Sequence, residues 1–386
     1  MITSPTLVFA LLAGVVALFA WLEARTKWRG FEVFPPLLWI YAVPVVLNNT
    51  GVLPRESVAY DLLGDIALPT LLVAMLISID VRRTLRLLGR GLGVMVTASL
   101  GIVLGSVFAY ALTRNALPPD AWKLYGALSG AWIGGTGNML AVARGIGLPD
   151  ANLGVAVLAD NLVLIFWLPV LIASRRFAGR FARWSGADPT VTSVLDQASA
   201  PAGPTRPVTV PDLMYLIAVI AIVVAFADAL APRMPVWGAV LTAGSWRTLL
   251  LTTFAIVASF TPARHLAGSR ELGVTLVYLF LAGVGARASM AGLANAPVFL
   301  AGAALLVAIH GAFCLLGARI FRADIHTAAI ASAANIGGAA TAPVVAAHHR
   351  EALVPASILM AMVGYASGNY LALLTTHLCS LLAPTN

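Results

Sequence analysis

The sequence predicts an all-α polytopic membrane protein, and three observations support this fold class. The 386 residues are 60% hydrophobic and only 10% charged, whereas soluble domains average about 25% charged residues. The apolar residues form continuous runs without the alternation of barrel strands, so helices are the expected spanning elements. The basic residues lie in short clusters between these runs, as the positive-inside rule requires, and do not form a nucleic-acid surface. A soluble enzyme and a nucleic-acid partner are therefore excluded, and the lipid bilayer is the expected surrounding.

Segments long enough to span a membrane need about 20 mostly apolar residues. The first candidate, 6–23, has no basic residue before it and no small-residue cleavage site, so we expect a retained span and no signal peptide. At the same threshold the chain predicts about 11–13 transmembrane helices, with candidates at 6–23, 33–49, 58–79, 91–113, 121–143, 152–174, 211–231, 236–260, 271–293, 296–318, 324–346 and 353–382.

A polar, Pro-rich stretch at 185–210 divides these candidates into two groups. Its composition is typical of a flexible exposed linker. We therefore expect an N-terminal half (1–184), containing the first span and one repeat, and a C-terminal half (211–386), containing a second repeat.

Three arginine clusters set the expected topology: Arg82 to Arg90, Arg175 to Arg183, and Arg319 with Arg322. All three are expected on the cytoplasmic side. Three predicted spans separate the first two clusters, however, which would place them on opposite sides. Either the rule is broken once or the span count is wrong by one.

An internal repeat links the two halves, because three local matches recur in the same order at nearly one offset. Such duplication is typical of secondary transporters, whose sites lie where helices are interrupted. The matches are Ile133-Gly134-Gly135 with Ile336-Gly337-Gly338 at 203 positions, Thr70-Leu71-Leu72 with Thr275-Leu276-Val277 at 205, and Asn161 with Asn369 at 208.

Glycines interrupt two of the predicted spans, at 129–139 and at 334–343. Glycine costs about 1 kcal/mol in a helix interior, so we expect both helices to open and free backbone groups, which a membrane tolerates only around a cavity or within protein. A half-helix N-terminus can then bind an anion, and freed carbonyls can bind a cation. The alternative is that the glycines only allow close helix packing. The residues expected at these breaks are Gly134, Gly135, Gly137, Gly337, Gly338 and Asn369.

Two ionisable residues lie deep inside predicted spans. Asp160 is near the middle of an apolar run, with no basic residue within one helical turn. Intramembrane carboxylates are expensive and usually functional, so we expect Asp160 to bind and release a proton or Na⁺; a packing role is the alternative. His310 could titrate during transport, although a lone histidine on an apolar helix is more often a hydrogen-bonded packing residue.

The sequence gives no sign of metal, nucleotide or nucleophile chemistry. His348 and His349 are adjacent and lack ligand spacing, and the Gly-rich stretches lack the Lys-Ser/Thr of a phosphate-binding loop. Cys314 and Cys379 both lie in apolar segments. We therefore expect no enzyme, no catalytic residues, no metal site and no cofactor beyond a coupling ion.

Several motifs together resemble the YjcL-like family of uncharacterised bacterial and plastid membrane proteins. The resemblance covers most of the chain and implies a multi-pass protein of the bacterial inner membrane. It rests on Asn48 to Pro54, Leu68-Pro69, Asp80-Val81-Arg82-Arg83, Ile133 to Asn138, Ala159-Asp160-Asn161, Ala334 to Gly338 and Gly364 to Tyr370.

That family is similar to cation/proton antiporters, bile-acid/sodium symporters and auxin-efflux carriers. The likeness implies two inverted repeats, a panel or dimerisation domain that forms a homodimer, and a core with two broken helices that cross at the site. Asp160-Asn161 would match the cation-binding pair after the first break. Gly368-Asn369 lacks a second charge and no lysine accompanies the pair, which argues against two-proton exchange. In inverted repeats, the two broken spans must also lie an odd number of spans apart, whereas the predicted breaks lie six spans apart. The span 236–260 is the weakest of the predicted spans.

The resulting hypothesis is an ion-coupled secondary transporter that moves a small anionic organic solute by alternating access. The alternatives are a Na⁺/H⁺ antiporter without an organic substrate and, less favoured, an intramembrane enzyme acting on lipid. The coupling-ion site is expected to comprise Asp160, Asn161, Asn138, Thr136, Asn335 and Thr341.

Overall fold

The computed structural model describes residues 2–26, 31, 36–187, 206–287 and 296–384, and this part of the chain is almost entirely helical. Eight of its helices are long and apolar enough to cross a membrane. The predicted all-α membrane fold is thus confirmed. Most of the predicted linker, the start of the predicted span 33–49 and the end of the span 271–293 lie outside the described residues.

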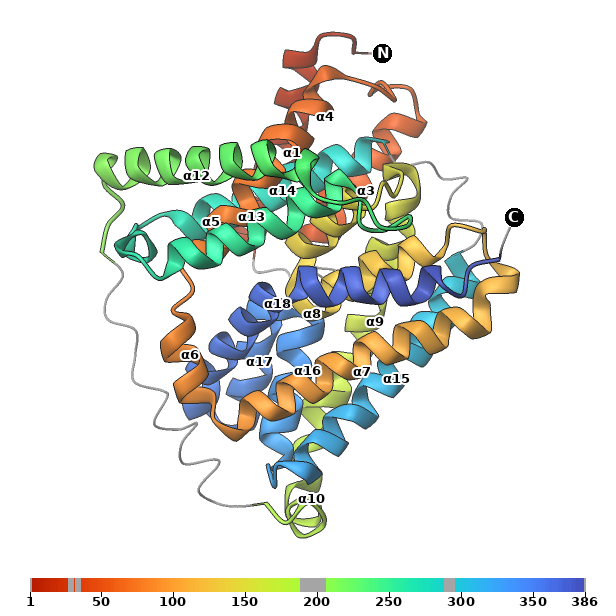
Figure 1. Cartoon of the computed structure of the whole chain (residues 1–386), viewed down its shortest axis with the longest axis vertical. Helices are drawn as coiled ribbons and strands as arrows, with labels where there is room; N and C mark the ends of the chain where they lie inside the picture. Colours follow the sequence, from red (N-terminus) through yellow and green to blue (C-terminus); the bar gives the residue numbers. More distant parts are fainter. Residues whose placement is uncertain (1, 27–30, 32–35, 188–205, 288–295, 385–386) are drawn as a thin grey trace.

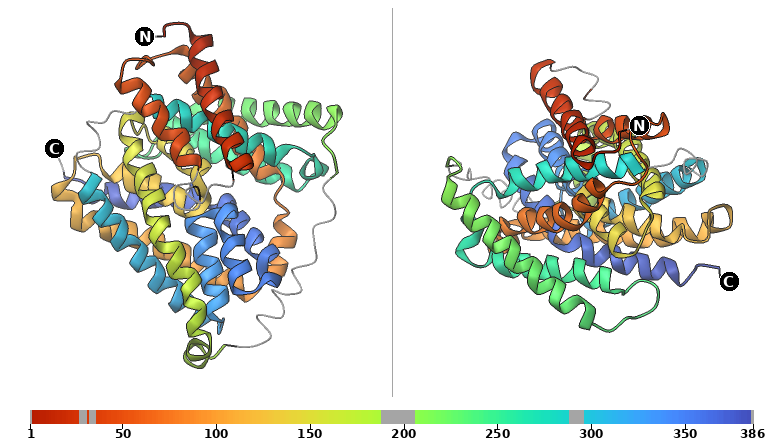
Figure 2. Two further views of the ribbon diagram at one scale, coloured as in Figure 1. Left: turned by 180° about the vertical axis from the view of Figure 1, so that it is seen from behind. Right: turned by 90° about the horizontal axis from the view of Figure 1, so that it is seen from above.

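The helices form two groups, which occupy the upper and lower parts of Figure 1 and remain distinct from behind in Figure 2. The upper group, here called the panel, contains α1 (Pro5–Thr26), α3 (Pro36–Asn49), α4 (Val58–Leu62), a π-helical turn (Leu63–Ala67), α5 (Leu68–Ile77), α12 (Val210–Leu230), α13 (Ala243–Ser259) and α14 (Ser269–Arg287). The lower group, here called the core, contains α7 (Arg90–Thr113), α8 (Trp122–Gly145), α9 (Asp150–Ser174), α10 (Ala178–Ser185), α15 (Ala296–Ile320), α16 (Ile325–Ile336), α17 (Gly338–His349) and α18 (Val354–Ser380). The short helix α6 (Val81–Leu88) joins the two groups.

Local sequence signals explain where several of these helices begin. Thr209 and Asp212 form a capping box that starts α12, and the Asp324 carboxylate accepts the Thr327 amide N–H at the start of α16. Both arrangements satisfy amide groups that the first helical turn leaves without partners. The helices begin close to the predicted boundaries for this reason.

Equivalent helices of the two halves pack antiparallel. In the α7–α15 pair, a Cβ on Gly93 would overlap the Phe321 ring, and one on Gly302 would touch Thr113. The start of each helix therefore lies beside the end of the other. The α5–α14 pair repeats this relation, since Gly273 lies against Met75 while Gly283 lies against Leu63 (Leu63 being in the π-turn just before α5). In both pairs, the equivalent helices of the two halves therefore run in opposite directions.

The first glycine-rich segment, α8, is a re-entrant hairpin. Its chain reverses at Gly135, whose φ of 79° and ψ of 175° are open only to glycine. The two arms, 122–134 and 136–145, then pack against each other, so that a Cβ on Gly130 would lie 3.2 Å from the Met139 backbone. Lys123 Nζ, at the start of the first arm, donates to Gly147 O, just beyond the second arm, at 3.1 Å. This segment is called hairpin 1 below. Both of its ends lie on one side of the layer that the membrane-spanning helices form.

The second segment, α16 with α17, is also a hairpin and is called hairpin 2 below. Its arms lie side by side in Figure 1, and the chain turns at Gly338, where φ is 60°. His326, at the start of α16, and His349, at the end of α17, approach to 3.0 Å between their Nδ1 atoms. The expected crossing of two through-going broken helices is therefore wrong in one respect: the breaks are present, but each helix turns back where it was expected to continue.

The hairpins also resolve the conflict between the arginine clusters. Because 121–143 does not cross the layer, only α7 and α9 separate the first two clusters, and these lie on the same side. The third cluster joins them, since Arg319 Nη1 donates to Ser185 O at 3.2 Å. We call this side the arginine face and the other the opposite face. Among the described helices between the two hairpins, α9, α12, α13, α14 and α15 each run from one face to the other, whereas the short helix α10 does not. Hairpin 1 therefore enters from the opposite face and hairpin 2 from the arginine face.

Candidate functional site

The tips of the two hairpins meet around Tyr365 of α18. A Cβ on Gly135 would lie 3.1 Å from the Tyr365 ring, and one on Gly338 would lie 3.1 Å from its hydroxyl oxygen. The Ala339 amide donates to that hydroxyl at 3.1 Å, while the Asn138 side chain donates to the Tyr365 carbonyl, also at 3.1 Å. Tyr365 therefore fixes the two tips relative to each other.

Each tip is closed by a polar side chain four residues after its first glycine. The Asn138 amide group occupies the space where a Cβ on Gly134 would lie, and the Thr341 side chain does the same at Gly337. Gly134 also lies so close to α18 that its Cβ would be 2.9 Å from the Gly364 carbonyl oxygen. The repeated pattern of isoleucine and two glycines followed by a polar residue is thus a folding motif for a tight helical hairpin.

A cavity of about 440 Å³ lies between the tips, the core helices α9 and α18, and the panel. Its polar part is formed by Gly135, Thr136, Gly137, Asp160, Asn161, Gly337, Gly338, Thr341 and Tyr365. The panel contributes apolar residues together with Ser78, Arg270, Tyr278 and Glu23. Ser78 follows the end of α5 and Arg270 is in the first turn of α14, so the cavity extends from the tips towards the arginine face.

Asp160 places one carboxylate on the cavity wall. Trp132, on the first arm of hairpin 1, donates its indole N–H to Asp160 Oδ1 at 3.0 Å. Within the described residues, Oδ2 has no hydrogen-bond partner and neither oxygen has an ion-pair partner. The site thus offers a carboxylate oxygen to a ligand at the level where the two hairpins end, next to the neutral side chains Asn161 and Thr341.

Two of the predicted ion ligands, Asn138 and Asn335, and the predicted break residue Asn369 are absent from the cavity wall. Asn138 points towards α18; Asn335 is fully buried and accepts a hydrogen bond from Ser99; Asn369 donates to Thr252 of α13 at 2.8 Å. Residues two apart do not share a helix face, so Thr136 and Asn138 cannot both face the cavity. Gly134 also packs away from the cavity, against α18.

His310 is a packing residue of α15. Its Nδ1 donates to Ala98 O of α7 at 3.0 Å, and its Nε2 accepts from the Ser332 hydroxyl at 2.9 Å. Trp167 of α9 in turn donates to the Ser332 oxygen at 2.9 Å. This network joins α7, α9, α15 and hairpin 2, and His310 does not line the cavity.

Three residues of the site carried no role in the sequence-based hypothesis: Trp132, Arg270 and Tyr365. Trp132 and Tyr365 lie within motifs that were singled out for their glycines, but nothing in the sequence shows which way an aromatic side chain points. Arg270 is a single basic residue at the start of a span, a position where arginine ordinarily extends to the membrane surface. Only the tertiary structure shows that it lines the cavity.

The chain can now be compared with known proteins. The family described as "Protein of unknown function (DUF819)" matches residues 10–382. The chain belongs to this family. Over 368 residues it is also 28% identical to the uncharacterized membrane protein YjcL of Bacillus subtilis (strain 168), and the match covers 90% of each chain.

The comparison confirms the likeness to YjcL and the multi-pass membrane character. The DUF819 match includes both hairpins, α9 and α18. The candidate site therefore lies within the DUF819 region.

Proposed function

We propose that this DUF819 protein is an ion-coupled secondary transporter, which uses Na⁺ or H⁺ to move a small organic anion by alternating access. One observation carries the proposal: Asp160 and the tips of two oppositely oriented hairpins line a single cavity between panel and core. A membrane tolerates interrupted helices where they line a cavity, and transporters place their substrate and ion sites there.

The ion would bind at Asp160. A carboxylate without an ion-pair partner in the described part of the chain can accept either a proton or Na⁺, and Thr136, Asn161 and Thr341 can add neutral oxygen atoms from the same cavity wall. Oxygen ligands of this kind suit a hard cation. A single carboxylate favours coupling to one monovalent ion.

The solute would be anionic because of Arg270. Its guanidinium group forms no ion pair with any described residue, yet it lines the same cavity as Asp160. Arg270 lies seven residues before Val277, which is about 10 Å along α14, and Val277 lies beside Gly137 at the tip. A small organic carboxylate of this length could contact Arg270 and the tips together, while the apolar wall covers its carbon chain.

The surrounding architecture supports a wider placement. We propose that the protein is related to the cation/proton antiporters, bile-acid/sodium symporters and auxin-efflux carriers, with hairpins in place of crossing helices, and that it forms a homodimer in the bacterial inner membrane. The arginine face would be cytoplasmic by the positive-inside rule. The cavity would then be in its cytoplasm-facing state.

The test is a flux measurement in proteoliposomes with imposed Na⁺ or proton gradients and a panel of small mono- and dicarboxylates. We expect gradient-driven uptake of at least one carboxylate, loss of the gradient dependence in Asp160→Asn, and a raised KM in Arg270→Gln. Asp228→Asn, which changes a carboxylate outside the cavity, should behave as the wild type. Uptake that ignores both gradients and survives Asp160→Asn would refute ion coupling.

The second candidate is a Na⁺/H⁺ antiporter without an organic substrate, because Asp160 could exchange the two ions by itself. It predicts proton release on addition of Na⁺ without any carboxylate, lost in Asp160→Asn and unaffected by Arg270→Gln. The Arg270 variant therefore separates the two candidates.

A further inference from the structure

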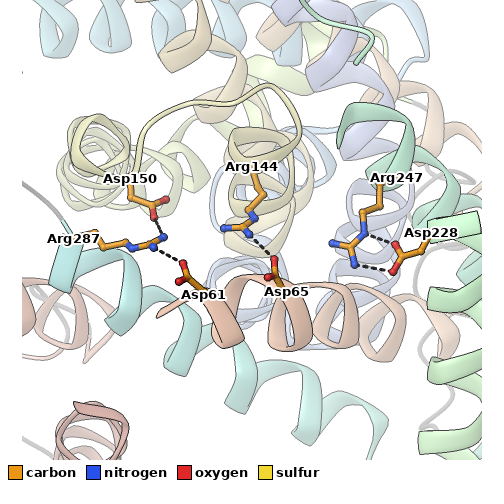
Figure 3. A network of polar contacts seen from close by, with 7 residues as sticks. All are labelled: Asp61, Asp65, Arg144, Asp150, Asp228, Arg247 and Arg287. Carbon is orange, nitrogen blue, oxygen red and sulfur yellow. Dashed lines mark hydrogen bonds and ion pairs between the residues drawn. The ribbon is translucent and has the colours of Figure 1, made fainter. Parts of the chain in front are cut away.

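Ion pairs join the panel to the core on the opposite face (Figure 3). Arg144, at the end of hairpin 1, donates to Asp65 of the panel at 2.6 Å. Arg287, at the end of α14 in the panel, donates to Asp150 at the start of α9 at 2.9 Å and to Asp61 at 2.6 Å. Two of these contacts, Asp65–Arg144 and Asp150–Arg287, cross the boundary between the groups.

We infer that Asp65–Arg144 and Asp150–Arg287 form a releasable latch, which keeps the cavity closed towards the opposite face and breaks whenever the cavity opens there. The inference rests on the alternating access proposed above. The cavity of this structure extends towards the arginine face, so the opposite face is the side that a transporter must hold closed in this state.

The panel has a surface shaped to receive Arg144. The π-helical turn Leu63–Ala67 interrupts the helix at this point, and π-turns inside helices are often found at functional sites. Gly64 lies within the turn, and a Cβ there would be 2.5 Å from Arg144 Nη1. The guanidinium group therefore rests directly on the Gly64 backbone while it binds Asp65. A side chain at position 64 would push Arg144 away from its partner.

The pairs are weak enough to be released. Asp65 and Arg144 are 64% and 36% exposed, whereas Asp150 and Arg287 are 23% and 22% exposed. Exposed pairs contribute little to stability, and neither pair is fully buried, a condition that would strongly resist separation. Arg287 is shared between a panel carboxylate and a core carboxylate, so it keeps Asp61 as a partner when Asp150 moves away. Separation of panel and core thus leaves no isolated arginine at the end of α14.

The chain contains a matched control for the latch. Arg247 and Asp228 form an ion pair with similar exposure, but both residues belong to the panel (Figure 3). A change in this pair alters charge and local stability without removing an ion pair between panel and core. Comparison with Asp228→Asn therefore shows which effects arise because an ion pair joins panel and core, and which arise from the loss of a carboxylate alone.

A single-cysteine reporter can measure the latch in membrane vesicles of known orientation. Cys314→Ala and Cys379→Ala remove the two native cysteines, and Val277→Cys places a thiol on the cavity wall. A membrane-impermeant thiol reagent is then added on either side. We expect Asp65→Asn with Asp150→Asn to raise labelling from the opposite face about fivefold, as the loss of two partly hydrated pairs implies, and to lower labelling from the arginine face.

The charge swap Asp65→Arg with Arg144→Asp should return both labelling rates towards those of the starting protein, and Asp228→Asn should leave them unchanged. Equal rates in the latch variants and the starting protein would overturn the latch, as would the same increase in Asp228→Asn. If the starting protein is labelled from only one face under every ion gradient and with every carboxylate tested, the proposal of alternating access itself is refuted. The two failures are therefore distinguishable.

Discussion

The two hairpins share a backbone plan and differ in chemistry. Both reverse at a glycine pair preceded by isoleucine, both close the tip with a polar side chain, and both pack on a long helix from the other half of the chain. Hairpin 1 packs on α18, where Gly126 meets Thr376, and hairpin 2 packs on α9, where His349 Nε2 donates to Leu171 O at 2.9 Å. The duplicated sequence therefore encodes a duplicated scaffold.

The difference lies at equivalent positions beside the tips. Trp132, three residues before Gly135, binds Asp160 on α9. Asn335, three residues before Gly338, binds Ser99 on α7, and α18 carries Gly368 at the position that corresponds to Asp160. The scaffold is thus symmetric, but only one half supplies a carboxylate. This asymmetry agrees with the proposed coupling to one monovalent ion.

The largest predicted contrast concerns the glycines that reverse the chain. Gly135 has a backbone conformation open only to glycine, so Gly135→Ala should destabilise the protein by about 3 kcal/mol. Gly338, with a φ of 60°, lies in the left-handed region, where alanine costs about 1 kcal/mol and asparagine is tolerated. Thermal unfolding in detergent measures both changes.

Asparagine variants provide the control for this contrast. Gly338→Asn should lose less stability than Gly135→Asn, because asparagine tolerates the left-handed region, but its Cβ would still lie 3.1 Å from the Tyr365 hydroxyl oxygen. Gly135→Asn should be destabilised almost as much as Gly135→Ala. Equal losses at the two positions would mean that the tips tolerate side chains alike and that the backbone difference is unimportant.

A smaller contrast is expected at the first glycine of each pair. A Cβ on Gly134 would meet the Gly364 backbone as well as Asn138, whereas the three atoms nearest to a Cβ on Gly337 all belong to the Thr341 side chain. Because a backbone cannot rotate away, Gly134→Ala should cost about 2 kcal/mol and Gly337→Ala less than half of that. Addition of Thr341→Ala should relieve Gly337→Ala, while Asn138→Ala should not rescue Gly134→Ala. Rescue in both hairpins would contradict the role given to the Gly364 backbone.

The helices, the two breaks and the deep position of Asp160 could be predicted from sequence, because apolar length, glycine content and an isolated charge are local signals. The reversal of the chain could not. A glycine pair marks where a helix stops but does not define the direction of the next arm, which depends on tertiary contacts such as His326 with His349. The conflict between the arginine clusters was nevertheless an indirect signal, since it disappears when 121–143 turns back.

The residues that line the cavity were harder to predict than the scaffold for a similar reason. Asn138 and Asn335 have the oxygen atoms that a cation prefers, but their helix faces point towards α18 and α7. Arg270 and Tyr365 were missed because the surfaces they share are formed by segments distant in sequence. A sequence shows which residues could bind an ion, whereas helix rotation decides which of them face the cavity.

The smallest predicted effect concerns two tryptophans, each of which forms a hydrogen bond between a hairpin and α9. Trp132 orients the Asp160 carboxylate from hairpin 1, and Trp167 of α9 donates to Ser332 of hairpin 2. Loss of a group that orients an ion ligand typically weakens binding about tenfold, so Trp132→Phe should raise the ion concentration for half-maximal uptake by that factor and leave the maximal rate nearly unchanged. Trp167→Phe removes a comparable hydrogen bond about two turns along α9 from Asp160, and should lower thermal stability without altering ion affinity. Equal shifts in ion affinity would show that both tryptophans act only through the stability of the core, and the functional asymmetry of the hairpins would then be lost.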